Sequence, residues 1–175
     1  FQAVSITTTT GFTTSNFAAW PSVAPIILLF AAFAGGCAGS TAGGIKMIRV
    51  LMIYLQGMRE VKRLIHPNGV FTIKLGRESV ADRRVDAVWS FFSVYVFFFL
   101  LSVCALMVLS DIDFITAFSA VGACLNNLGP GLGDVAANYN SISAEVKWVL
   151  MFNMVLGRLE IFTLLVLLTP AYWRR

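Results

Sequence analysis

The chain has 175 residues, of which 58% are hydrophobic and 13% are charged. Soluble domains carry about 25% charged and about 45–50% apolar residues, so this composition excludes an ordinary soluble domain. One histidine, His66, and three scattered cysteines exclude most metal-binding and nucleophilic sites. We therefore predict a membrane protein. Because the sequence begins at Phe1 without an initiator methionine or a signal-peptide pattern, we expect a C-terminal portion of a longer protein.

The apolar segments, taken in chain order, differ in whether they can span a bilayer, which requires about 20 helical residues. Residues 23–55 are interrupted by the glycine-rich stretch AGGCAGSTAGG at 34–44. Residues 87–109 carry no charge and predict a transmembrane helix. Residues 114–125 cover only about half a bilayer, which favours a re-entrant helix. Residues 148–169 are long enough for a span but contain two charged side chains.

The basic residues are distributed asymmetrically along the chain. Most lie between the glycine-rich stretch and the 87–109 helix or after the last apolar segment, and they are Lys46, Arg49, Arg59, Lys62, Arg63, Lys74, Arg77, Arg83, Arg84, Arg174 and Arg175. The positive-inside rule places these residues in the cytoplasm, in a hairpin at about 57–86 and at the C-terminus. The net charge of +4 therefore reflects membrane topology, and nucleic acid is not expected as a partner.

Two short polar segments form a weak internal repeat. When Gly11 is aligned with Gly129, TTTGFT at 8–13 lies over NNLGPG at 126–131. A loop and an interrupted apolar stretch follow each segment, with Gly35-Gly36 over Gly157-Arg158. Internal repeats in membrane proteins commonly place the transport site where the repeats meet.

A polar segment that follows a half-length helix suits the transfer of a monovalent cation. Within a bilayer, irregular backbone is tolerated only where it is buried in protein or lines water. A row of backbone carbonyls can replace the hydration shell of a cation, and glycine permits the backbone conformations that turn carbonyls to one side. The alternative interpretation is a surface loop rich in threonine and asparagine.

The glycine-rich stretch admits two interpretations. Its small residues are Gly35, Gly36, Gly39, Ser40, Thr41, Gly43 and Gly44. Gly35, Gly39 and Gly43 recur every four residues on one helix face, which suits close packing of helices. A second small face, and a cost of about 4–5 kcal/mol for five glycines relative to alanine in a helix, favour an unwound segment that crosses a pore.

Placing an arginine such as Arg158 near the middle of a membrane helix costs about 2.5–3.5 kcal/mol of insertion free energy. Glu160 is two residues away, about 200° around a helix, so the two side chains cannot pair well within it. Arg158 either pairs with another helix or loop, or holds a positive charge below a filter, where it repels cations until a conformational change moves it.

A membrane chain of this composition has two other possible classes of function, an enzyme and a membrane anchor. An intramembrane hydrolase needs an activated Ser or Cys beside a base, but Cys37 and Ser40 are predicted far from His66, which lies in the cytoplasmic hairpin. We therefore expect no enzyme. A membrane anchor or assembly subunit without its own ion pathway, docking a cytosolic regulatory partner through that hairpin, remains as the alternative. Changes at Gly11 or Gly129 would leave its function untouched.

Five segments in combination resemble the TrkH-type bacterial potassium-uptake proteins of the Trk/Ktr/HKT superfamily. These segments are ITTTTGFTT at 6–14, FAGGCAGSTAGGIK at 33–46, VKRLIHPN at 61–68, LNNLGPGLG at 125–133 and GRLEIFTLLVLLTP at 157–170. The resemblance covers essentially the whole chain. It implies an all-α membrane protein built from four potassium-channel-type repeats of helix, pore loop and helix around one pore, with about one and a half repeats present here.

The resemblance also implies a division of the chain. Residues 1–56 are the end of the third repeat, with a filter loop and a second helix that an intramembrane loop breaks at about 35–44. Residues 57–86 are the basic cytoplasmic hairpin. Residues 87–175 are the fourth repeat, with helix 87–109, pore helix 113–125, filter 126–132, helix 145–170 and a cytoplasmic tail.

The resemblance assigns potassium to two filter loops and to no other metal site, with K⁺ as the transported ion and no organic cofactor. The filter residues are Thr7, Thr8, Thr9, Thr10 and Gly11 in the third repeat and Leu125, Asn126, Asn127, Leu128 and Gly129 in the fourth. Asn-Leu replaces Thr-Thr in the fourth loop, so we expect selectivity to be less sharp than in a fourfold symmetric filter. The glycine-rich stretch and Arg158 are expected to form the gate.

The family resemblance further implies partners and a location. It places the protein in the lipid bilayer of the bacterial inner membrane, as a multi-pass protein with a cytoplasmic C-terminus. It implies a homodimer and a nucleotide-binding, TrkA-like regulatory subunit on the cytoplasmic face. No intramembrane carboxylate beyond Glu160 is available for a proton relay, which favours a channel-like route over coupled transport.

Overall fold

The computed structural model describes residues 1–21, 23–37, 39–40, 42–76 and 78–173. Thr41 of the predicted gate and the basic residues Arg77, Arg174 and Arg175 lie outside these described residues.

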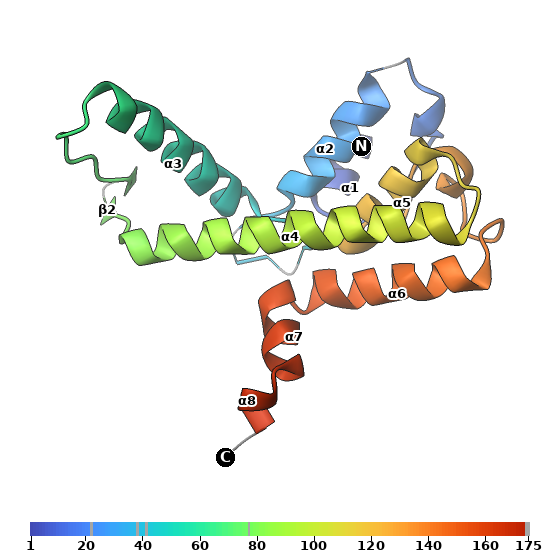
Figure 1. The fold of residues 1–175 in the computed structure, drawn as a ribbon. Coiled ribbons are helices and arrows are strands. Elements are labelled where there is room, and N and C mark those ends of the chain that lie inside the picture. Colours follow the sequence, from blue (N-terminus) through green and yellow to red (C-terminus); the bar gives the residue numbers. More distant parts are fainter. Residues whose placement is uncertain (22, 38, 41, 77, 174–175) are drawn as a thin grey trace.

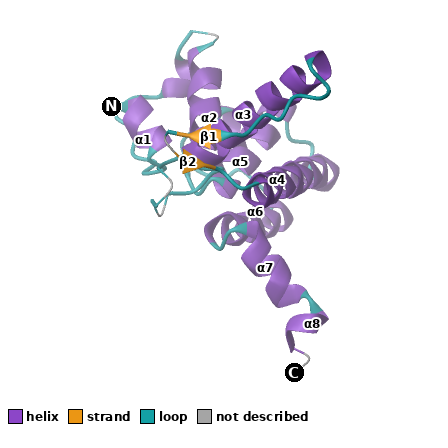
Figure 2. Ribbon diagram, turned by 90° about the vertical axis from the view of Figure 1, so that its left-hand side faces the viewer, coloured by secondary structure: helices purple, strands orange, loops and turns teal. Residues whose placement is uncertain are grey.

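The described chain is helical apart from one short hairpin (Figure 1). The helices are α1 (Gln2–Thr7), η1 (Phe17–Ala19), α2 (Ala24–Ala34), α3 (Met47–Ile65), α4 (Asp82–Leu109), α5 (Phe114–Leu125), η2 (Gly133–Val135), α6 (Ala144–Arg158), α7 (Ile161–Leu168) and α8 (Pro170–Trp173). Strands β1 (Lys74–Leu75) and β2 (Glu78–Ser79) pair antiparallel, with Lys74 opposite Ser79. Figure 2 shows the same helices from the side, with α7 and α8 leading away from the rest.

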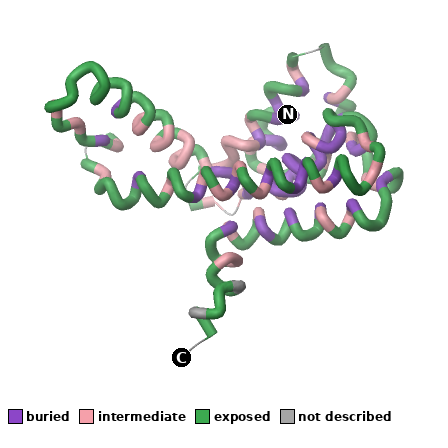
Figure 3. The backbone as a smooth tube through the Cα atoms, in the orientation of Figure 1, coloured by how far each residue is buried: buried purple, intermediate pink, exposed green. Residues whose placement is uncertain are grey.

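Helix α5 lies at the centre of the molecule and packs against α2, α4 and α6. Nine of its twelve residues are buried, and burial in Figure 3 is concentrated around it. Small side chains on α5 let its neighbours approach closely, since a Cβ added to Gly122 would lie 3.1 Å from the Phe33 ring. A short apolar helix buried on this scale is stable inside protein although it is too short to cross a bilayer.

Helix α4 is the longest helix and contains the predicted span 87–109. It begins earlier than predicted, at Asp82, because a carboxylate in the first turn is favourable to the helix dipole and the backbone there needs no apolar side chains. Among the described helices, α4 alone is long and apolar enough to cross a membrane by itself. It is fastened to α6 inside the core, where Ser102 Oγ donates a hydrogen bond of 2.8 Å to Asn153 Oδ1.

The predicted helix over 145–170 is interrupted in the structure, next to the Gly157-Arg158 position that the repeat aligns with Gly35-Gly36. Helix α6 ends at Arg158, Glu160 adopts a positive φ of 53°, and α7 then leaves at an angle of 103° to α6. The two helices together are long and apolar enough for one span, but as a broken one. The sequence holds no proline between Glu145 and Thr169, and the weak repeat is the one sign of an interruption. The break lies where the Glu160 carboxylate turns toward Lys46 and Arg49.

The glycine-rich stretch follows an irregular path instead of the helix that close packing would require. Helix α2 ends at Ala34, Gly35 enters the positive-φ region at 63°, and α3 starts only after Lys46, whose φ is 70°. The described residues between them form turns and bends. Glycine supplies the left-handed conformation at Gly35 without steric cost, which ends α2 at that point.

We predict that Gly157→Ala destabilises the complete protein. A Cβ at Gly157 would lie 1.9 Å from the Leu125 carbonyl oxygen, so α6 would have to move away from the end of α5. Thermal unfolding of the purified protein in detergent tests this. Gly57→Ala is the matched control, because Gly57 is also helical but has open space at its Cβ, and alanine there gains about 0.5–1 kcal/mol in a helix. Equal midpoints for the two variants would contradict the prediction.

Candidate functional site

Helices α1 and α5 end in the same backbone conformation. Thr8 after α1 has φ and ψ of −83° and 0°, and Asn126 after α5 has −88° and 0°. The next residues, Thr9 and Asn127, are left-handed with φ of 54° and 55°. Asparagine is enriched in this region, but a β-branched threonine is an outlier there, so the surrounding structure must hold Thr9 in place.

The same pair of hydrogen bonds closes both helix ends. Thr10 N donates to Ser5 O over 2.9 Å, and Leu128 N donates to Ala123 O over 2.8 Å. In each case the preceding residue donates to a carbonyl three residues back over 3.1 Å. These are the two bonds of a Schellman motif, which caps the last carbonyls of a helix and lets the chain leave in a new direction.

The loops that follow the two helices touch one another. Gly11 and Gly129, which the sequence aligns, both have positive φ, at 79° and 102°. A Cβ on Gly11 would lie 2.2 Å from the carbonyl oxygen of Leu128, so only glycine permits this approach. The structure therefore brings the two predicted filter loops together as equivalent, neighbouring elements.

The loop after α1 is held by its own hydroxyl groups. Ser5 Oγ donates to the Phe12 carbonyl over 2.7 Å, and the hydroxyls of Thr8 and Thr10 lie 2.8 Å apart. Each of these bonds joins residues within seven positions of one another, so part of what holds this loop is local.

The loop after α5 is held by tyrosines from elsewhere in the fold. Tyr95 of α4 donates to Asn126 Oδ1 over 2.7 Å, in a buried contact. Tyr139, between η2 and α6, donates to the Gly129 carbonyl over 2.7 Å. The second loop is therefore held by side chains from outside its own segment.

Gly43 of the glycine-rich stretch contacts both loops. Its backbone N–H donates to Thr9 Oγ1 over 3.2 Å, and an added Cβ would lie 1.9 Å from the Asn126 carbonyl oxygen. The hydrogen bond helps to explain why Thr9 keeps its unusual backbone conformation. The irregular stretch thus lies directly against the ends of the two half-length helices.

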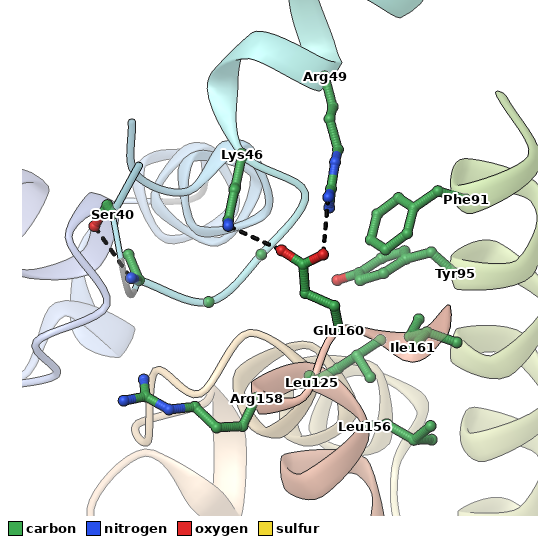
Figure 4. Close-up of a pocket in the computed structure, with 14 residues that line it drawn as sticks. Ser40, Lys46, Arg49, Phe91, Tyr95, Leu125, Leu156, Arg158, Glu160 and Ile161 are labelled. Atoms are coloured by element: carbon green, nitrogen blue, oxygen red, sulfur yellow. Dashed lines mark hydrogen bonds and ion pairs between the residues drawn. The ribbon is translucent and has the colours of Figure 1, made fainter. Parts of the chain in front are cut away.

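An ion-pair cluster fastens the far end of this stretch. Glu160 accepts from Lys46 Nζ at 2.9 Å and from Arg49 Nη2 at 3.0 Å, and its carboxylate lies between the two basic groups in Figure 4. The Arg49 guanidinium also stacks over the Phe91 ring, 4.2 Å from its centroid. Both sides of the main pair are positive-φ residues that precede a resumed helix, Lys46 before α3 and Glu160 before α7.

A cavity of about 160 Å³ lies between the glycine-rich stretch, α4 and the α6–α7 break. Its lining includes Ser40, Gly43, Tyr95, Arg158 and the Glu160 cluster. In Figure 4 the Arg158 side chain lies in this region but extends away from Glu160, as their spacing predicts. Arg158 and the glycine-rich stretch therefore line one cavity.

The other residues of the predicted gate contribute less direct contacts. A Cβ on Gly36 would meet Ser40 and Ala42 of the same stretch, and Gly39 has open space around it. Gly44 packs near the end of α2, with an added Cβ 3.0 Å from the Ala32 carbonyl.

Several residues of the site were missed or misjudged from the sequence. The sequence pattern assigns Lys46 and Arg49 only to the cytoplasmic side of the membrane. It predicts no functional role for Phe91, Tyr95 or Tyr139. Lys46 and Arg49 are three positions apart at the start of α3, close enough to share one acidic partner. The tyrosine contacts had no signal, because they join residues far apart in the chain.

Comparison with known proteins connects this geometry to a family. The family model described as "TrkH: Cation transport protein" matches residues 1–175. The chain is 57% identical over 175 residues to the Trk system potassium uptake protein TrkH of Vibrio parahaemolyticus, covering 99% of this chain and 36% of that protein. It is 54% identical over 174 residues to TrkH of Escherichia coli K12 and 38% identical over 176 residues to TrkG of the same strain, with the same coverage.

A solved structure agrees. The crystal structure of the potassium transporter TrkH from Vibrio parahaemolyticus superposes with a TM-score of 0.90 at 56% identity, over 99% of this chain and 37% of that one. The chain thus spans about a third of the length of these relatives. The all-helical membrane fold and the resemblance inferred from the sequence motifs are confirmed. The chain belongs to the TrkH family of cation transport proteins.

Proposed function

We propose that the protein takes up potassium through a pore lined by backbone carbonyls, and that this chain supplies two neighbouring quarters of its filter. The observation that carries the proposal is the equivalence of the two touching loops, which share a Schellman ending and a positive-φ glycine at Gly11 and Gly129. The relatives are named potassium uptake proteins. The remaining quarters would come from the part of the protein that this chain does not span.

The chemistry of such a filter is replacement of water by protein oxygens. A potassium ion sheds its hydration shell and is ligated by carbonyls of Thr7–Gly11 and Leu125–Gly129, which cost no reorganisation if the loops already hold their shape. Different contacts hold the two loops, so the two quarters present ligands of unequal stiffness. This supports modest rather than sharp discrimination between potassium and sodium.

The glycine-rich stretch is the proposed gate. It lies against both loops through Gly43, and it ends at the Lys46–Glu160 ion pair. A stretch without regular hydrogen bonding can move at low cost if these contacts break. Arg158 lines the same cavity, and its positive charge opposes entry of a cation while the stretch is in place.

The proposed arrangement in the membrane follows the sequence assignments with one change. Residues 1–56 would belong to the third repeat, 57–86 to a cytoplasmic hairpin and 87–175 to the fourth repeat, whose last helix is broken at Glu160. The protein would be a multi-pass protein of the bacterial inner membrane with a cytoplasmic C-terminus. A homodimer and a TrkA-like nucleotide-binding subunit on the basic hairpin are the proposed partners.

Gly129→Ser tests the filter. At φ of 102° a serine is strained although space for its Cβ exists, so we expect the loop to distort and the preference for rubidium over sodium to fall. Rubidium uptake by cells carrying the complete protein, with sodium as competitor, measures this. Gly76→Ser is the matched control, since Gly76 also has positive φ and open space but lies in the hairpin. Equal selectivity in both variants would favour the membrane-anchor interpretation.

Arg158→Ala tests the charge in the gate. Removing the guanidinium is expected to raise basal rubidium flux roughly tenfold, the factor that a barrier lower by about 1.4 kcal/mol gives. Lys147→Ala, which removes the other basic residue of α6, should leave basal flux as it is. If the basal flux of Arg158→Ala equals that of the unaltered protein, Arg158 has no role in gating.

Glu160→Gln tests the attachment of the gate to the α6–α7 break. The neutral side chain no longer holds both Lys46 and Arg49, so we expect higher basal flux and a fall of roughly 1–3 °C in the thermal midpoint. The fall is small because the Glu160 side chain is 44% exposed. Glu78→Gln in the hairpin removes a carboxylate of the same type, and a matching rise in flux there would rule out a specific role for Glu160.

A further inference from the structure

Gly129 is the glycine of the second loop, and packing does not restrain it. A Cβ built on Gly129 would find no atom within 4 Å among the described residues, whereas one on Gly11 would meet the neighbouring loop at 2.2 Å. No packing at Gly129 itself therefore holds its carbonyl in place. The ring of Pro130 limits rotation of the following peptide, and a hydrogen bond to the carbonyl can fix its direction further.

The hydroxyl of Tyr139 makes the contact that can do this. It donates a hydrogen bond of 2.7 Å to the Gly129 carbonyl oxygen. Tyr139 is half-buried, and its ring packs against the core formed by α4, α5 and α6. A ring held in this way has little freedom, so the position of its hydroxyl is set by the protein core and not by the loop.

The Tyr139 hydroxyl is itself oriented by Cys124 of α5. The Cys124 thiol lies 3.9 Å from the Tyr139 oxygen and can donate to it, which leaves the phenolic proton directed at Gly129. Burial, followed by the nearby Cys124, raises the pKa of Tyr139 well above its ordinary value. The phenol therefore remains a neutral donor throughout the physiological range of pH.

We propose that Tyr139 is a positioning residue for selectivity, which acts by fixing the direction of the Gly129 carbonyl. The inference rests on the proposed filter function and deepens it. A carbonyl oxygen has two lone pairs, so Gly129 can accept from Tyr139 and still ligate an ion with the other. A carbonyl tied to the protein core cannot move inward around sodium, the smaller ion, as readily as a free one, and this disfavours sodium relative to potassium.

Tyr139 differs in this respect from Tyr95, the other tyrosine at the loop. Tyr95 donates to the side chain of Asn126, so its loss affects a backbone carbonyl only indirectly. Tyr139 donates to the backbone itself at the glycine with positive φ. Loss of the Tyr139 hydroxyl should therefore change ion selectivity more than it changes the amount of folded protein.

The test is Tyr139→Phe in the complete protein, which removes only the hydroxyl and keeps the packed ring. Rubidium uptake is measured against increasing sodium in cells that lack other potassium uptake. We expect sodium to compete roughly threefold to tenfold better than in the unaltered protein, the range that loss of one hydrogen bond covers. The ratio of the two ions does not depend on how much protein reaches the membrane, so lower expression would not obscure the result.

Tyr54→Phe is the matched control, because Tyr54 is 63% exposed on α3, far along the chain from both loops. It should keep the selectivity of the unaltered protein. Unchanged selectivity in Tyr139→Phe, or lower uptake with an unchanged ratio, would overturn the inference and leave the filter proposal standing. A complete protein without any preference for rubidium, in which Gly129→Ser also has no effect, would overturn both.

Discussion

Burial of the short helix α5 is the constraint on which the rest of the structure depends. The helix is surrounded by α2, α4 and α6, and its small residues let these neighbours come close. Gly122 of α5 leaves room for the Phe33 ring, and Gly157 of α6 lies against the Leu125 carbonyl. Glycines on α5 and on its neighbour α6 therefore both allow the close packing. A helix of this length is too short to cross a bilayer, and the packing around it fixes where its C-terminal end, and therefore Asn126, is placed.

Of the four residues with positive φ that are not glycine in the described chain, three are held by contacts from distant parts of the chain. Thr9 accepts a hydrogen bond from Gly43, and Lys46 and Glu160 pair with one another. Conformations of this kind cost about 1–3 kcal/mol each and persist only where the surroundings over-determine them. These three residues therefore lie at contacts between segments that are far apart in the chain.

The pairing of Lys46 with Glu160 has a structural meaning beyond an ion pair. Each residue precedes the helix that resumes after an interruption, so the pair joins the two points at which a helix resumes. The two interruptions differ in length, since one extends over the glycine-rich stretch and the other over only two residues. The ion pair of Lys46 with Glu160, with Arg49 as a second basic partner, brings the ends of the two interruptions together although they differ in length.

Much of this arrangement was predictable from the sequence alone. The alignment of Gly11 with Gly129, the half-length helix over 114–125, the uncharged span at 87–109 and the broken stretch after residue 34 all follow from local pattern, because helix length and glycine content act on neighbouring residues. The interruption next to Gly157-Arg158 follows from the weak repeat, but the contacts of Glu160 there were not predictable, since its partners are basic groups more than 100 positions away. By itself, the sequence determined the membrane class, the family motifs and the residues of the two loops. Only the tertiary structure decided that the loops touch, that tyrosines hold one of them, and that a carboxylate fastens the glycine-rich stretch, because each of these rests on contacts between residues that no local pattern relates.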